Sequence, residues 1–178
     1  MKCAVVVSSK DGNTRMVADA LADALAQAGA EVLGCVDIAE DAGAAADAAS
    51  AADVVLAGFW TDKGDCAPEM ASFLEALDGK RVFLFGTAGF GGSAEYFARI
   101  LGNVQQHLPA SAELIGSAMC QGKMGVGVRK RYEGMLAQNP GDERIQAMID
   151  NFDAALSHPD ADDLAGIVSA AQSALGLA

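Results

Sequence analysis

Five short apolar runs, separated by segments with a helical period, follow one another along the first 120 residues. Runs of about four to eight apolar residues bounded by turn residues are typical of strands buried on both faces. Strands that alternate with helices predict a parallel sheet covered by helices on both sides and wound by right-handed crossovers. The predicted strands span residues 3–7, 31–37, 53–58, 81–85 and 113–119.

The helical segments between these strands carry recognisable start or stop signals. Gly29 ends the first, at 13–28, Pro68 suits the first turn of the third, and Ser93 caps the fourth. The second, at 41–50, is rich in alanine and only weakly amphipathic. Each segment is long enough to cross over one face of the sheet, so the sequence predicts a three-layer α/β/α arrangement.

Three more helical segments follow the last strand, at about 125–138, 142–156 and 164–175. One of them is needed to cover the sheet after the last strand, and the others are additional. No long linker separates them from the rest of the chain. We therefore expect a single domain, with a core of about residues 1–140 and a helical extension of about 141–178.

The chain is strongly acidic, with a net charge of −12. Such a chain is expected to repel nucleic acid and anionic membranes. Its acidic surface would steer it instead towards a basic patch on a partner protein. We expect a monomer or weak dimer.

Cysteine and histidine are placed in a way that does not predict a metal site. The four cysteines, at 3, 35, 66 and 120, have no CxxC spacing, and the chain has only two histidines. Well-separated cysteines are typical of proteins in a reducing cytoplasm. The first apolar run is too short for a signal-peptide core, and no run of about 18 apolar residues predicts a membrane span. We expect a cytoplasmic protein.

The stretch SSKDGNT, residues 8–14, joins the first strand to the first helix. Ligands of parallel α/β sheets bind beyond the carboxyl ends of the strands, and this loop is one such end. Gly12 permits a tight turn, and the helix N-terminus offers unpaired N–H groups. A phosphate would suit these groups, together with those of Ser9, Lys10, Asp11, Asn13 and Thr14. The alternative is a helix cap without a ligand.

The same stretch resembles the flavodoxin signature, [ST]-x-x-G-x-T-x-x-x-A-x-x-L. Ser9, Gly12, Thr14, Ala18 and Leu21 match it, whereas Val7 stands where the family often has an aromatic residue. The P-loop pattern GxxxxGK[ST] and the pattern GxGxxG are both absent from this loop. The resemblance implies a flavodoxin-like doubly wound sheet of five parallel strands in the order 2-1-3-4-5, with FMN as its cofactor.

Two later loops could hold the flat, apolar ring of a flavin. GFWTDKGDC, residues 58–66, contains the only tryptophan of the chain, and GTAGFGGS, residues 86–93, offers closely approaching backbone around one phenylalanine. The alternatives are a core tryptophan and a flexible loop whose phenylalanine packs inward. The predicted ring contacts are Phe59, Trp60, Thr61 and Asp62 in the first loop and Thr87, Ala88, Gly89, Phe90 and Gly91 in the second.

Three acidic residues, Asp62, Asp65 and Glu69, accompany the first of these loops. Negative charge near a flavin disfavours the reduced, anionic ring and would lower its potential. Solvated loop charges are the equal alternative. Cys66 is expected to be a small buried filler, and His107 is expected to be structural or exposed.

The resemblance favours an electron-transfer flavodoxin that delivers low-potential electrons to a redox partner protein through its acidic surface. No residue of the chain is predicted to be catalytic, because the cofactor would carry the chemistry. One alternative is a flavin-dependent reductase acting directly on a quinone or tetrapyrrole, and another is a flavin-free interaction module. The reductase is favoured by a basic cluster that could hold an anionic substrate or a partner's carboxylates and could equally be a solvated helix face: Lys123, Arg129, Lys130 and Arg131.

Overall fold

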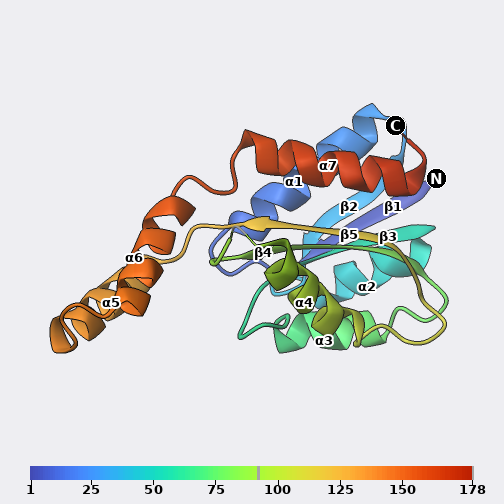
Figure 1. Cartoon of the computed structure of the whole chain (residues 1–178). Coiled ribbons are helices and arrows are strands. Elements are labelled where there is room, and N and C mark those ends of the chain that lie inside the picture. The colour runs from blue at the N-terminus through green and yellow to red at the C-terminus, as the bar shows by residue number, and fades with distance from the viewer. Residues whose placement is uncertain (92, 178) are drawn as a thin grey trace.

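A computed structural model describes residues 1–91 and 93–177 of the chain and contains one parallel sheet of five strands (Figure 1). The strands are hydrogen-bonded in the order β2-β1-β3-β4-β5, which confirms the predicted fold class and strand order. Gly92 of the predicted glycine-rich loop, and Ala178, lie outside the described residues. The strands are β1 (Lys2–Val7), β2 (Glu31–Asp37), β3 (Val54–Trp60), β4 (Arg81–Ala88) and β5 (Glu113–Gln121).

Three strands continue two or three residues beyond their predicted ends. Trp60 is paired with Thr87 across β3 and β4, and Ala88 is paired with Gln121 across β4 and β5. Pairing persists because each strand has a parallel neighbour of matching length. Trp60, Thr87 and Ala88 therefore lie at strand ends and not in loops, which corrects the predicted boundaries.

Helices cover both faces of the sheet (Figure 1). On one face, α1 (Asn13–Gln27) and α7 (Ala161–Leu175) pack against buried side chains of β1, β3 and β4. The other face is covered by α2 (Ala42–Ala51), α3 (Pro68–Glu75) and α4 (Ala94–Gln105). None of the helices in the described part of the chain has the length and apolar character needed to cross a bilayer.

The remaining helices, α5 (Val126–Gln138) and α6 (Glu143–Ala155), pack on each other and project from one end of the sheet (Figure 1). The helix that covers β5 is α7, whose Ile167 and Ala171 are buried in the core beside α1. This arrangement differs from the expected division at residue 140. The part that stands away from the sheet lies between β5 and α7, because the apolar stripe of the last helix is needed on the sheet.

Two glycines at the centre of the sheet make room for aromatic rings of the neighbouring strand. A Cβ on Gly58 would lie 2.2 Å from Cζ of Phe85, and a Cβ on Gly86 would lie 2.5 Å from Cζ of Phe59. Both rings are fully buried, so neither can move into solvent. These glycines are needed for packing and not for backbone freedom.

We therefore expect Gly86→Ala to lower the free energy of unfolding by about 1–3 kcal/mol, the usual cost of overpacking a core. Gly102 in α4 provides a matched control, because a Cβ there meets no atom within 4 Å. Gly102→Ala should instead stabilise the protein by about 0.4–1 kcal/mol, since alanine loses less backbone entropy in a helix. Urea denaturation of both variants measures the difference. Equal effects of the two substitutions would contradict the role given to the Phe59 ring.

Candidate functional site

A cavity of about 710 Å³ lies at the carboxyl ends of β1, β3 and β4. Its volume falls within the range of about 300–1,000 Å³ that is usual for small-molecule sites. Loops that follow four different strands, together with α4 and α5, form its walls. Most of the predicted site residues line it: Lys10, Asp11, Asn13, Thr14, Trp60, Thr61, Asp62, Thr87, Ala88, Gly89 and Phe90.

Four predicted site residues do not line the cavity. Phe59 is fully buried in the core over Gly86, contrary to its predicted exposure to a flavin. The side-chain oxygen of Ser9 accepts a hydrogen bond from the backbone N–H of Arg15 at 3.1 Å. Gly12 is the N-cap of α1, and the backbone N–H of Gly91 donates a hydrogen bond to Asn151 of α6.

The first loop turns sharply into α1 at Gly12. Gly12 is the N-cap of α1 and has φ 83°, in the left-handed region that favours glycine. Its carbonyl accepts the N–H of Met16 at 3.0 Å, which begins the helical hydrogen bonding. Gly12 itself has no side chain to cap this helix end, and the side-chain oxygen of Ser9 takes only the N–H of Arg15, in the third position of the helix. The N–H groups of Asn13 and Thr14, which come before it, are therefore available to an anion at the end of the cavity.

Asn13 has one buried polar atom without a partner. Its side-chain nitrogen donates to the carbonyl of Lys123 at 2.8 Å, which joins the first loop to the segment after β5. Its Oδ1 is buried and has no hydrogen-bond partner within the described residues. Buried acceptors without partners are rare because each costs about 1–3 kcal/mol. A ligand hydroxyl or N–H in the cavity would satisfy this oxygen.

Two buried hydroxyls face each other below the same loop. The side-chain oxygens of Thr14 and Thr87 lie 2.9 Å apart, so one hydroxyl donates to the other. The second hydroxyl proton remains available for a ligand acceptor. Thr61 donates its hydroxyl to the carbonyl of Thr87 at 2.9 Å, which holds the end of β3 against β4.

Aromatic rings form much of the wall. Trp60 is partly buried, with the ammonium of Lys10 4.7 Å from its ring centroid. Phe90 is 38% exposed and lines the cavity. Tyr96 of α4 and Tyr132 of α5 also line it, although the sequence did not point to them. Because the aromatic side chains come from β3, the loop after β4 and two helices, the site depends on the whole fold.

A tight turn carries the loop after β3 along the cavity. Asp62 and Asp65 exchange two backbone hydrogen bonds, of 2.8 and 3.0 Å, around Lys63 and Gly64. Both central residues have positive φ, 51° and 90°, as in the two-residue turns of hairpins. The turn places Lys63 and Gly64 on the cavity. Neither residue was a predicted site residue, and Gly64 was the local signal that could have indicated the turn.

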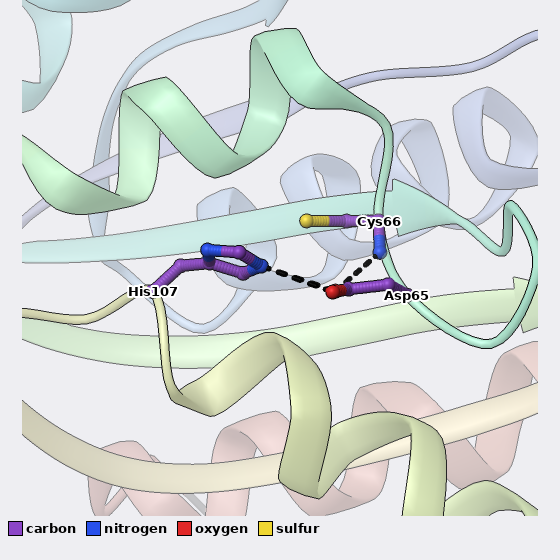
Figure 2. A group of neighbouring side chains, drawn as sticks. All are labelled: Asp65, Cys66 and His107. Carbon is purple, nitrogen blue, oxygen red and sulfur yellow. Dashed lines mark hydrogen bonds and ion pairs between the residues drawn. The ribbon is translucent and has the colours of Figure 1, made fainter.

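The last turn of α4 and the segment that follows it hold this turn from outside the cavity (Figure 2). Nε2 of His107 lies 3.2 Å from both carboxylate oxygens of Asp65, and Asn103 donates to the carbonyl of Gly64 at 2.9 Å. Cys66 is buried beside them, and burial raises the pKa of its thiol to about 12. The thiol therefore stays protonated, as expected for a buried filler, and His107 has a structural contact.

Only one of the three acidic residues expected near a flavin lies on the cavity. Asp62 lines it, whereas Asp65 is paired with His107 and Glu69 accepts the hydroxyl of Ser8 at 2.8 Å. Two of the three carboxylates that were expected to lower the flavin potential, those of Asp65 and Glu69, therefore do not line the cavity.

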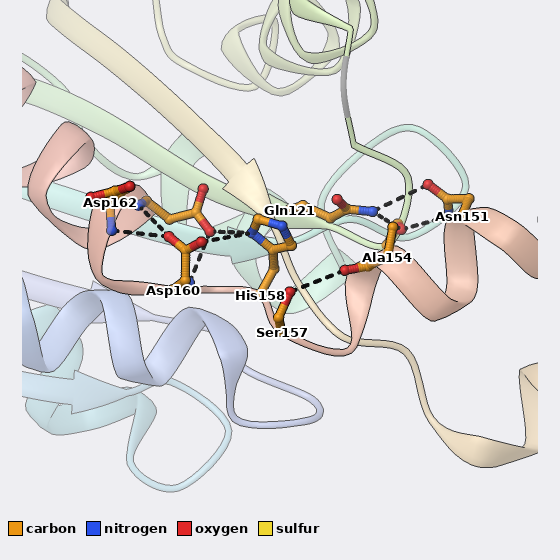
Figure 3. Close-up of polar contacts among 9 residues, drawn as sticks. Gln121, Asn151, Ala154, Ser157, His158, Asp160 and Asp162 are labelled. Carbon is orange, nitrogen blue, oxygen red and sulfur yellow. Dashed lines mark hydrogen bonds and ion pairs between the residues drawn. The ribbon is translucent and has the colours of Figure 1, made fainter.

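Helix α6 holds the loop that carries Phe90 (Figure 3). Asn151 and Gln121 each donate a side-chain N–H to the carbonyl of Gly89, at 3.0 and 3.1 Å. The N–H of Gly91 donates to Asn151 at 3.4 Å. The α5–α6 hairpin thus supports one side of the cavity. Further wall residues not predicted as site residues are Arg99, Lys123, Met124, Gly125, Val128 and Arg131.

The second histidine is also structural. Nδ1 of His158 lies 2.5 Å from the carboxylate of Asp163, in the first turn of α7 (Figure 3). Asp160 caps the same helix through the N–H groups of Asp162 and Asp163. His158 therefore fixes the entry into α7.

Comparison with known proteins identifies the family. The model of the flavodoxin domain matches residues 4–172. A flavodoxin-like domain-containing protein named BilS from Clostridium symbiosum is 43% identical over 93% of this chain and 91% of its own length. A protein of the same name from Clostridioides difficile is 32% identical over 92% of this chain and 90% of its own.

A solved structure supports the same fold. The flavodiiron core of Flv1 from Synechocystis sp. PCC6803 has a TM-score of 0.51 and 18% identity, covering 87% of this chain and 36% of that one. At this identity the likeness concerns the fold alone. The domain match spans nearly the whole chain, and the chain therefore belongs to the flavodoxin domain family.

Proposed function

We propose that this protein binds FMN in the cavity and carries electrons to a partner oxidoreductase. Flavodoxin domains bind flavin and serve in electron transfer in general, and the finer assignment rests on the site. Its main support is Asn13, a residue that lines the cavity and has a buried, unpaired Oδ1, next to the N-terminus of α1, whose N-cap Gly12 offers no side chain. A ligand with both an anionic end and hydroxyl donors suits this pair of features.

The residues of the chain have separate tasks in this proposal. The N–H groups that follow Gly12 and the buried Thr14–Thr87 hydroxyl pair suit the phosphate. The unpaired Oδ1 of Asn13 would accept a hydrogen bond from a hydroxyl group of the sugar-alcohol chain. Trp60 and Phe90 offer apolar faces to the ring. When bound, FMN supplies the ability to accept and release electrons singly.

The only tryptophan of the chain provides a direct test. Trp60 lines the cavity, so bound FMN should quench tryptophan emission saturably, at one FMN per chain. Riboflavin lacks the phosphate and should bind at least about tenfold more weakly if the α1 terminus holds that group. FMN that binds without quenching Trp60 would refute this location, and absence of FMN binding would refute the function.

Direct reduction of a small molecule is the second candidate. It is favoured by Lys123 and Arg131, two members of the predicted basic cluster that line the cavity. Arg129 is instead paired with Glu133 and Asp153, and Lys130 does not line the cavity. The FMN-loaded protein would then reduce a quinone or tetrapyrrole with NAD(P)H alone. Dependence on a separate reductase would support the electron carrier.

A further inference from the structure

The charge around the cavity is opposite to that of the whole chain. The chain has twice as many acidic as basic residues, 24 against 12. Among the described residues that line the cavity, five are basic and two are acidic. The basic residues are Lys10, Lys63, Arg99, Lys123 and Arg131, and the acidic ones are Asp11 and Asp62.

A bound phosphate, with a charge of about −1.5 to −2, would reduce this excess of three positive charges but would not remove it. Lys10 and Asp11 both belong to the loop before α1, where the phosphate is proposed to lie. The other four basic residues belong to the turn after β3, to α4, to the segment after β5 and to α5, and only Asp62 opposes them on the cavity. All four are exposed. We call them the basic rim: Lys63, Arg99, Lys123 and Arg131.

The charges of the basic rim are not used in ion pairs. Within residues 1–91 and 93–177, no carboxylate lies within 4.0 Å of a rim nitrogen. The guanidinium of Arg99 lies 5.4 Å from the ring centroid of Tyr96, and that of Arg131 lies 5.6 Å from that of Tyr132. Both rings line the cavity. These contacts keep the two cations beside the opening while leaving their charge available.

Screening makes this local charge more important than the net charge. At an ionic strength of 0.1 M the Debye length is about 10 Å, so acidic groups on distant faces contribute little at the opening. An exposed apolar side chain lies on the same cavity, since Phe90 lines it and is 38% exposed. An apolar centre bordered by charge is the usual composition of a protein interface.

We propose that the electron-transfer partner docks over the basic rim with an acidic face. This inference rests on the proposed function and gives the partner a charge opposite to the one expected from composition. The approach of the two proteins would be steered by the rim, and salt would weaken it. The reduced flavin would give one electron to the partner's oxidised centre, whose reduction balances the transfer.

Cytochrome c provides a matched pair of protein acceptors, because succinylation converts its basic surface into an acidic one around the same haem. The FMN-loaded protein is reduced without oxygen and mixed with each form in a stopped-flow instrument, at ionic strengths from about 0.05 to 0.5 M. We expect the rate of haem reduction to fall with salt for the succinylated form and to rise for the native form. The proposal would be overturned if the rate of haem reduction did not fall with salt for the succinylated form, or did not rise with salt for the native form.

Charge-reversal variants assign the effect to the rim. Lys63→Glu with Arg131→Glu should slow reduction of the succinylated form about tenfold or more at low salt. Arg144→Glu is the control, because Arg144 is exposed in the first turn of α6, at the far end of the hairpin (Figure 1). Unchanged rates in the double variant would overturn the proposal. FMN binding of each variant is measured first by Trp60 quenching, which distinguishes loss of FMN from loss of docking. If the double variant does not fold, the salt dependence of the unmodified protein is by itself the test of the proposal.

Discussion

Gly12→Val is expected to weaken FMN binding by about 10- to 100-fold. Gly12 has φ 83°, and a β-branched residue in that region is strained by about 1–3 kcal/mol. The loop can relieve this strain only by turning its peptide groups, which would move the N–H groups of α1 away from the phosphate. A change of about 1.4 kcal/mol is a factor of ten in affinity. Titration with FMN, followed by Trp60 emission, measures the loss.

Gly12→Asn separates backbone conformation from side-chain bulk. A Cβ at residue 12 would meet no atom within 4 Å, so the position has room for a side chain. Asparagine adopts positive φ much more readily than valine and should retain most of the affinity. If valine bound FMN as well as glycine does, the proposed phosphate position would be rejected. Equal losses with asparagine and valine would point to bulk in place of backbone strain.

The fold could be predicted from local patterns because each strand and helix has its own signal. Five apolar runs and the helical segments between them predict a doubly wound sheet, and the sequence of the loop around Gly12 indicates the family. The strand ends were less predictable, because Trp60 remains in the sheet through pairing with Thr87, and Thr87 through pairing with Trp60 and with Cys120 of β5. Local sequence contains no information about such a neighbour. The same limit applies to Phe59, whose inward direction depends on the space left by Gly86.

Local sequence also could not show which of the last three helices covers β5. α6 and α7 both have an apolar stripe, and either could have covered β5. Asn151 and Gln121 meet at the carbonyl of Gly89, so the contacts that place the hairpin join residues at least 30 positions apart. The basic rim has the same origin, since its members come from four segments. Composition could only indicate an acidic protein, whereas the fold concentrates basic residues at one opening.

Asn13→Asp is expected to weaken FMN binding by about 10- to 100-fold at pH 8. A carboxylate cannot donate to the carbonyl of Lys123, so that contact, 2.8 Å in the native protein, would bring two acceptors together. The new charge would be buried next to the proposed position of the phosphate, at the N-terminus of α1. Burial favours the protonated acid, although the ammonium groups of Lys10 and Lys123 on the same cavity oppose this. FMN titrations of the variant and the native protein between pH 8 and pH 5.5 measure the difference.

The ratio of the two dissociation constants should decrease as the pH falls, because a protonated aspartic acid can again donate to Lys123. Taking the ratio at each pH removes the titration of the phosphate itself, whose second pKa is about 6. Asn103→Asp is the control, because Asn103 also donates to a backbone carbonyl of the cavity wall, that of Gly64, but is exposed. Its effect should be several-fold smaller, since water can solvate the carboxylate. A constant ratio across this pH range would mean that the buried charge is not the cause, and equal affinities of variant and native protein would remove Asn13 from the site.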